Sequence, residues 1–102
     1  MASRLQLQQE LVSLLGSENV YFQPPASVLL KYPCIVYDLS STNVARADNK
    51  NYIKTNEYIV RHIFKNLSNE KKNLILDHFK MINHNTRFVS DGLYHDVFTL
   101  FY

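Results

Sequence analysis

Two adjacent histidine and aspartate pairs are the residues in this sequence whose types could do catalytic chemistry. They are Asp77-His78 and His95-Asp96, and with three further aspartates they could supply the ligands of a metal-dependent nuclease: Asp38, Asp48 and Asp91. The spacing argues against a shared site, because neighbours on a strand point to opposite faces and neighbours on a helix lie about 100° apart. We therefore interpret the paired side chains as surface or loop-capping groups, and we predict no catalytic residue, no metal site and no cofactor.

The single cysteine, Cys34, has no base in a recognisable motif and no setting that would lower the pKa of its thiol. It stands between Pro33 and Ile35 in a segment with strand character, so we expect a small buried hydrophobic residue. One cysteine also cannot form an internal disulfide.

Composition and charge favour a small folded protein with protein partners. The 102 residues, 46% of them hydrophobic, predict one domain (residues 1–102) with a single core. Eleven basic and nine acidic residues give a net charge of +2, too small for phosphate neutralisation to dominate binding. The tyrosines could stack on bases, but no basic groove is interleaved with them. A small nucleic-acid-binding protein is therefore a less favoured alternative.

Hydropathy gives no indication of membrane insertion or export. No apolar run approaches the roughly 18 residues of a membrane-spanning helix. The first residues also lack the charged and then apolar order of a signal peptide. We expect a protein that is made and folded in the cytoplasm, with no membrane partner.

The N-terminal part predicts a helix and two strands. Leucines at helical spacing predict an amphipathic helix from Ser3 or Arg4 to Leu15, with Gly16 as the left-handed residue at its end. Val20–Gln23 predicts a short strand that Pro24-Pro25 ends, and the missing N–H donors exclude this segment from the middle of a sheet. The unbroken apolar run that begins Cys34–Leu39 predicts a strand buried on both faces.

A polar segment separates this strand from the next. Ser40–Asn51 has no useful periodicity and predicts a loop of about twelve residues. A loop of this length is either an arm that reaches a partner or a disordered segment. Tyr52–Phe64 then alternates as a long strand, whose more polar first half should extend the hairpin beyond the core.

The C-terminal part predicts one more helix and a hairpin. The helix should begin at Ser68 as its N-cap and run to about Met81, followed by a turn at Asn83-His84-Asn85. Thr86–Val89 and Tyr94–Tyr102 predict strands joined by an Asp91-Gly92 turn, with the apolar last strand inside the sheet. The order of elements predicts an α+β fold: a mostly antiparallel sheet of about four to five strands with two helices packed on it.

Four blocks of this sequence resemble a family of small bacteriophage proteins. They are Val20–Pro25, Tyr32–Tyr37, Ala47–Asn49 with Tyr52, and Leu93–Tyr102. They occur in the family's order and together extend over most of the chain. On these residues the sequence is similar to the minor tail, tail-completion or tail-terminator proteins of long-tailed phages.

The resemblance implies a structural virion protein of the tail and neck, not an enzyme, that is made in the host cytoplasm. It implies a hexameric ring on the head-proximal end of the tail tube, which ends tube growth and joins the tail to the neck. The implied partners are further copies of the chain, the tail-tube protein and a neck or head-completion protein. The genome would pass through the ring without specific nucleic-acid binding. A head-completion or neck connector subunit is the alternative that the sequence leaves open.

A ring made from one repeated chain needs two different complementary surfaces on each subunit. We expect the Ser40–Asn51 arm to supply one of them. Charged residues in it could form ion pairs that set the register between subunits, and a tyrosine next to it could act as a buried anchor. The candidate interface residues are Val44, Arg46, Asp48, Asn49, Lys50 and Tyr52.

Overall fold

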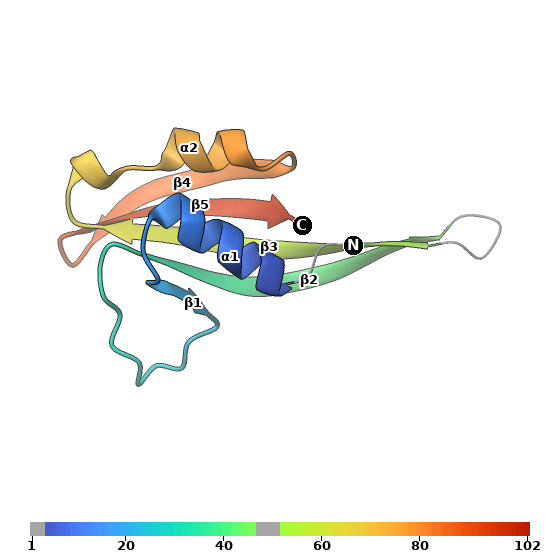
Figure 1. Ribbon diagram of the computed structural model, residues 1–102, viewed down its shortest axis with the longest axis horizontal. Helices are drawn as coiled ribbons and strands as arrows, with labels where there is room; N and C mark the ends of the chain where they lie inside the picture. The colour runs from blue at the N-terminus through green and yellow to red at the C-terminus, as the bar shows by residue number, and fades with distance from the viewer. Residues whose placement is uncertain (1–3, 47–51) are drawn as a thin grey trace.

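Two helices lie on one face of a five-stranded mixed sheet (Figure 1). The computed structural model describes residues 4–46 and 52–102, without the side chains of residues 43–46 and 52–55. In chain order the elements are α1 (Arg4–Leu15), β1 (Val20–Phe22), β2 (Cys34–Arg46), β3 (Tyr52–Phe64), the 3-10 turn η1 (Leu67–Asn69), α2 (Lys72–His78), β4 (Ile82–Ser90) and β5 (Leu93–Phe101). The predicted α+β fold is confirmed.

The strands follow the order β1-β2-β3-β5-β4, and every pair is antiparallel except β1 with β2. That pair is parallel because the chain crosses back through residues 23–33 before β2 begins. The prolines that follow β1 predicted a strand outside the middle of the sheet, and β1 is an edge strand. The prediction that the last strand lies inside the sheet is also confirmed, since β5 pairs with both β3 and β4.

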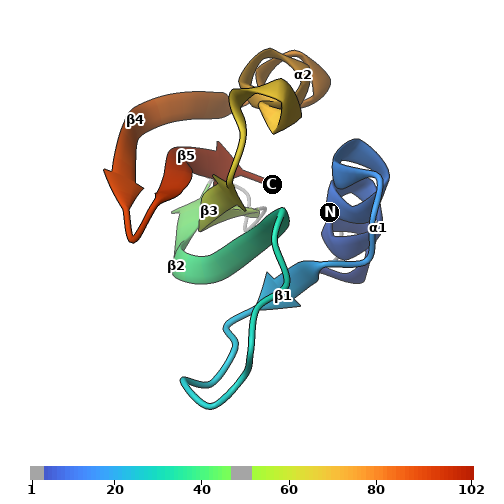
Figure 2. The ribbon, with the colours of Figure 1, turned by 90° about the vertical axis from the view of Figure 1, so that its left-hand side faces the viewer.

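The main core lies between the helices and the concave face of the sheet. Figure 2 shows the sheet curving around α1 and α2. α1 contributes four buried leucines at helical spacing, Leu7, Leu11, Leu14 and Leu15, as the sequence predicts. Alternate residues of the strands meet them, and the largest of these are Tyr37, Tyr58 and Phe98. A smaller cluster around Cys34, Val36 and Ile63 lies on the other face, so the start of β2 is buried on both sides, as predicted.

The second helix is shorter than the sequence predicts. The predicted N-cap, Ser68, lies in η1, and Glu70 has an extended backbone, so α2 begins only after Lys71. At the other end Phe79 is extended and buried, which takes the chain into β4 instead of another helical turn. The helix therefore occupies Lys72–His78, because tertiary packing of Phe79 overrides the helical periodicity.

Two segments that the sequence assigns to turns and loops are strand. Asn83-His84-Asn85 belongs to β4, where the register shifts between His84 and Thr86, and the predicted turn is wrong. Ser40–Arg46 continues β2, so the predicted twelve-residue loop is wrong for this part. Both segments are mostly polar, and a polar strand needs no apolar alternation as long as its backbone groups pair. The Asp91-Gly92 turn is confirmed, with the φ angles of 53° and 74° that a type I′ hairpin requires.

The leucines of α1 provide a direct test of this packing. Leu11 is fully buried, whereas Leu5 of the same helix is 64% exposed. Leu11→Ala should lower the free energy of unfolding by about 2–5 kcal/mol, because it leaves a cavity in the core. Leu5→Ala is the matched control and should change it by less than about 0.5 kcal/mol. Urea denaturation of both variants measures the difference, and equal losses would contradict this placement of α1.

Candidate functional site

The hairpin of β2 and β3 extends beyond the body of the sheet as an arm (Figure 1). Pairing with β5 ends at Glu57, and pairing with β1 ends at Tyr37. Beyond these points β2 and β3 pair only with each other, through four residue pairs that run from Asn43 with Thr55 to Arg46 with Tyr52. At roughly 3.3 Å per residue they span about 13 Å. We define the arm as residues 43–55.

The arm contains all six candidate interface residues. Among the described backbone, Val44 lies opposite Lys54, and Arg46 lies opposite Tyr52. The side chains of these residues, and the whole of Asp48, Asn49 and Lys50, lie outside the part of the chain that the structure describes. Their assignment to an interface therefore stays a prediction. The structure adds that Val44 and Arg46 belong to a paired strand instead of a loop, and that Tyr52 begins β3, as the sequence predicts.

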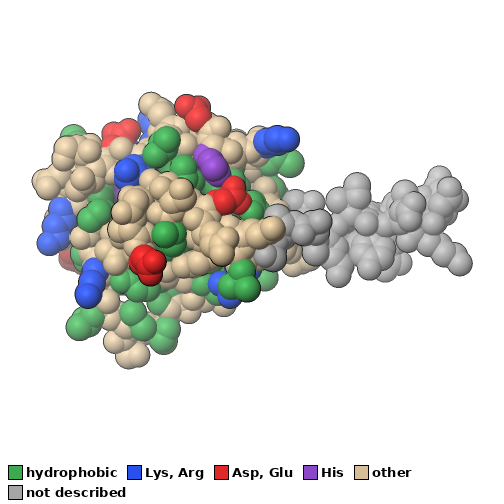
Figure 3. All heavy atoms as spheres, in the orientation of Figure 1, with side chains coloured by type: hydrophobic (Ala, Val, Ile, Leu, Met, Phe, Trp, Pro, Cys, Tyr) green, Lys and Arg blue, Asp and Glu red, His purple; other side chains and the backbone are tan. Residues whose placement is uncertain are grey.

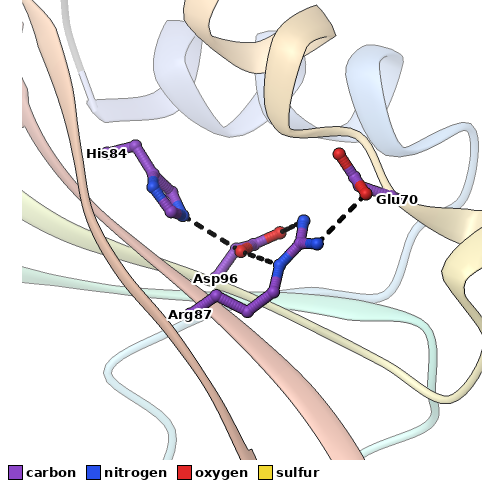
Figure 4. A network of polar contacts seen from close by, with 4 residues as sticks. All are labelled: Glu70, His84, Arg87 and Asp96. Atoms are coloured by element: carbon purple, nitrogen blue, oxygen red, sulfur yellow. Dashed lines mark hydrogen bonds and ion pairs between the residues drawn. The ribbon is translucent and has the colours of Figure 1, made fainter.

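An ion pair between a half-buried arginine and a buried carboxylate joins β4 to β5. Asp96 of β5 has no solvent exposure, and Arg87 of β4 donates two hydrogen bonds of 2.7 Å to its two carboxylate oxygens. Nε2 of His84 lies 3.0 Å from Oδ1 of the same carboxylate. Arg87 also donates a 3.1 Å hydrogen bond to Glu70, which stands two residues before α2 (Figure 4). The network thus connects the β4–β5 hairpin to the start of α2.

The charges in this network stabilise one another. Burial alone would raise the pKa of Asp96, but the hydrogen bonds from Arg87 and the contact with His84 outweigh it and hold that pKa below its usual value. The same hydrogen bonds raise the pKa of Arg87. Asp96 is therefore ionised, and its charge is compensated inside the fold. This corrects the interpretation of Asp96 as a surface or loop-capping group.

The Arg87–Asp96 pair could have been predicted from the position of the hairpin turn and the alternation along β5. A two-residue turn at Asp91-Gly92 sets Ser90 opposite Leu93, and counting outward from that pair sets Arg87 opposite Asp96. Asp96 also shares its strand face with Phe98 and Leu100, which are buried. The turn and the alternation together indicate a buried carboxylate facing an arginine.

His62 of β3 lies directly opposite Asp96 in the sheet and is also fully buried. Its ring stacks on Phe64, with 4.7 Å between the ring centroids. Among the described residues neither ring nitrogen has a hydrogen-bond partner. A protonated imidazolium would have to lose its hydration here without a direct acceptor, so the position favours the neutral ring.

Burial lowers the pKa of His62 to about 4, and this is the largest effect on it. The positive charges of Lys71 and Arg87 lower it further, while the negative charges of Asp96 and Glu70 oppose the shift. His62 is consequently neutral at pH 7. It acts as an aromatic core residue, and the sequence did not distinguish it from its apolar neighbours on β3.

The two histidine and aspartate pairs lie in different surroundings within the described chain. His95 lies on the convex face, stacked on Phe88 at a centroid distance of 4.6 Å, whereas Asp96 points into the core, so the predicted divergence of these neighbours is confirmed. His78 lies 2.8 Å from Glu10 of α1. In the part of the chain that is described, no group of three or more histidine, cysteine, aspartate or glutamate side chains could hold a metal ion.

Cys34 is fully buried, which confirms its interpretation as a small hydrophobic residue. Burial raises the pKa of its thiol to about 11, so the thiolate needed for nucleophilic attack is scarce at neutral pH. No described helix is long and apolar enough to cross a membrane.

Comparisons of this chain with protein-family models, with curated proteins and with solved structures give no match.

The buried ion pair predicts a large cost for removing one partner. Arg87→Met should lower the free energy of unfolding at pH 7 by about 3–5 kcal/mol, because Asp96 is then buried without its counter-charge. Arg61→Met is the matched control: Arg61 bonds Asp38 at 2.9 Å, but about 40% of both side chains is exposed, so the loss should stay below about 1 kcal/mol. Urea denaturation compares the two. Adding Asp96→Asn to Arg87→Met should recover part of the loss, and a loss that grows would contradict this explanation.

His62 predicts a specific dependence of stability on pH. Its pKa is about 4 in the native protein and about 6.5 when unfolded, so between these values the unfolded chain binds a proton that the native protein does not. Stability should therefore fall as the pH drops from 7 to 4.5, by about 2–3 kcal/mol from this residue. In His62→Phe this part of the fall should disappear. His95→Phe, on the convex face, should retain it, and urea denaturation at several pH values would contradict the assignment if both variants behaved alike.

Proposed function

We propose that this chain is a structural subunit of the tail of a long-tailed bacteriophage. In this proposal it is a tail-terminator or tail-completion protein that forms a hexameric ring at the head-proximal end of the tail tube. The ring ends tube growth and presents a surface to the neck. The proposal is supported by the resemblance of the four sequence blocks and agrees with the α+β fold.

The observation that carries the proposal is the arm. Within the described chain, no strand of the body pairs with its four terminal residue pairs on either side. A two-stranded hairpin is marginally stable in water, and unpaired strand edges readily pair with another chain. An arm of this kind is suited to a place in an assembly, where a neighbouring subunit covers its edges. The arm then supplies one of the contacts that hold the ring together.

The body of the subunit has the rigidity that such a ring needs. The Arg87–Asp96 pair is bidentate and its carboxylate is buried, so sliding β4 along β5 by one residue would leave the Asp96 charge in the core without its arginine. Glu70, two residues before α2, accepts a hydrogen bond from the same arginine, which connects the start of α2 to β4. A fixed register keeps the edges of the sheet in a constant position, and a closed ring requires the same contact geometry at every interface.

Shortening the hairpin tests the role of the arm. Residues 43–55 can be replaced by Asn-Gly, which joins Thr42 to Asn56; these two side chains are already linked across the strands by a 3.0 Å hydrogen bond. The variant should remain folded, because β1 and β5 pair with the parts of β2 and β3 that lie outside residues 43–55. It should be monomeric by native mass spectrometry under conditions in which the full chain forms rings.

Two controls separate the possible outcomes. Thermal unfolding by circular dichroism should show a cooperative transition for the shortened protein, and Lys80→Ala, an exposed change outside the arm, should leave the rings intact. Rings of normal mass from the shortened protein would contradict the role of the arm. Rings that bind a neck protein but not the tail-tube protein would instead favour the head-completion alternative.

A further inference from the structure

His62 and Asp96 are the two fully buried polar side chains of the described chain, and they lie directly opposite each other on β3 and β5. Asp96 is hydrogen-bonded to β4, whereas neither ring nitrogen of His62 has a partner among the described residues. Phe64 stacks on one side of the ring, at 4.7 Å between the centroids. A proton added to this ring would create a charge without water and without a bonded acceptor, which is costly in a core.

The groups around His62 do not compensate such a charge. Ile35, its neighbour on β2, is apolar, and the buried residues of α1 are all leucines. The carboxylate of Asp96 already accepts two hydrogen bonds from Arg87, so a protonated ring would place a second positive charge beside that arginine. The charged and titratable groups nearby are Asp96 of β5, His84 and Arg87 of β4, and Glu70 and Lys71 before α2.

Residues 65–74 lead from β3 into α2 and lie next to this network. They include η1 and the first residues of α2, and none of their side chains is buried. Even Leu67 and Leu74 are 54% and 51% exposed, and the upper rim of the body, where η1 and α2 lie, carries side chains of both charges (Figure 3). A segment with so few buried contacts opens at a low cost in free energy.

One ion pair links this segment to the sheet. Arg87 donates a 3.1 Å hydrogen bond to Glu70 (Figure 4), and about 30% of both side chains is exposed. Ion pairs that water reaches contribute little stability, so this pair does not lock the segment in place. The first fully buried side chain beyond it is Ile75, which anchors the rest of α2.

We propose that residues 65–74, which we name the flap, open in mildly acidic solution and admit water to a protonated His62. This inference goes beyond the proposed ring and concerns the single chain. In the open form the imidazole is hydrated and binds a proton as it does in an unfolded chain, whereas burial in the closed form opposes protonation. Because the open form binds a proton that the closed form does not, acid shifts the equilibrium toward the open form.

Hydrogen exchange of backbone amides, followed by NMR on the full chain at pH 7 and pH 5, tests the flap. The reporters are the amides of Asn69, Glu70 and Ile75, which donate hydrogen bonds of 2.9–3.1 Å to carbonyls within residues 66–71. Their protection factors, corrected for the intrinsic effect of pH on exchange, should fall roughly twentyfold from pH 7 to pH 5. This factor follows from a His62 pKa of about 4 in the closed form and about 6.5 in the open form.

Dilute urea separates opening of the flap from global unfolding. Opening exposes little surface, so protection of the reporter amides should hardly change up to about 1 M urea, whereas that of the most protected amides of β3 and β5 should decrease. The reporter amides should also exchange faster than those of β3 and β5 at both pH values. An equal urea dependence for both groups at pH 5 would overturn the flap, because the opening would then be global.

Substitution of two histidines identifies the group that is protonated. His62→Phe should abolish the twentyfold fall, and His62→Leu is the smaller replacement if phenylalanine prevents folding. His78→Gln is the matched control: His78 of α2 lies 2.8 Å from Glu10 of α1, so its titration is another way in which acid could loosen α2. The fall should persist in this control. A fall that persists in a folded His62 variant, that disappears in His78→Gln, or that is absent from the unsubstituted chain would overturn the proposal.

Discussion

Strand edges present N–H and C=O groups that must pair with something, and the edges of this sheet are paired only in part. β1 pairs with three residues of β2, and among the described residues no strand pairs with that side of β2 from Asp38 to Arg46. β5 covers β3 only from Glu57 onward, and β4 closes the sheet at the opposite end. Such edges promote association unless they are covered. The proposed assembly depends on this constraint, because the edges of the arm are the ones that a neighbouring subunit would cover.

The ion pair between Arg87 and Asp96 also constrains the arrangement of the strands, because it fixes the alignment of β4 on β5. An ionised aspartate in a core is costly unless it is fully compensated, and replacing such a pair by apolar residues is often neutral or stabilising. The Arg87–Asp96 pair is therefore weak evidence for stability as such. Its physical effect is on register: only one alignment of β4 on β5 brings the guanidinium to the carboxylate. The neutral His62 beside it avoids adding a second buried charge.

The sequence predicts those parts of the fold that local chemistry determines. Leucines at helical spacing define α1, Pro24-Pro25 places β1 at an edge, and Asp91-Gly92 forms its hairpin turn. The extension of the β2–β3 hairpin also follows from the polar first half of β3. These features could be predicted because each depends on a few neighbouring residues.

Features that depend on distant partners could not be predicted from local pattern. Ser40–Arg46 and Asn83-His84-Asn85 are polar, and only pairing with another strand makes them extended. α2 ends early because Phe79 packs into the core formed by the sheet and α1. For Asp96 the residue type alone indicates the surface, and its burial can be predicted only when the Asp91-Gly92 turn is used to set Arg87 opposite it. The candidate interface residues are a harder case, because the partner proposed for them is another chain.

The central claim is that copies of this chain assemble into a closed ring at the end of a tail tube. The most direct test is the native mass of this 102-residue chain, measured alone and with the tail-tube protein of the same phage. A hexameric ring predicts a species of six times the 12.0 kDa chain mass, formed alone or on addition of the tube protein. A chain that stays monomeric in both conditions would contradict it.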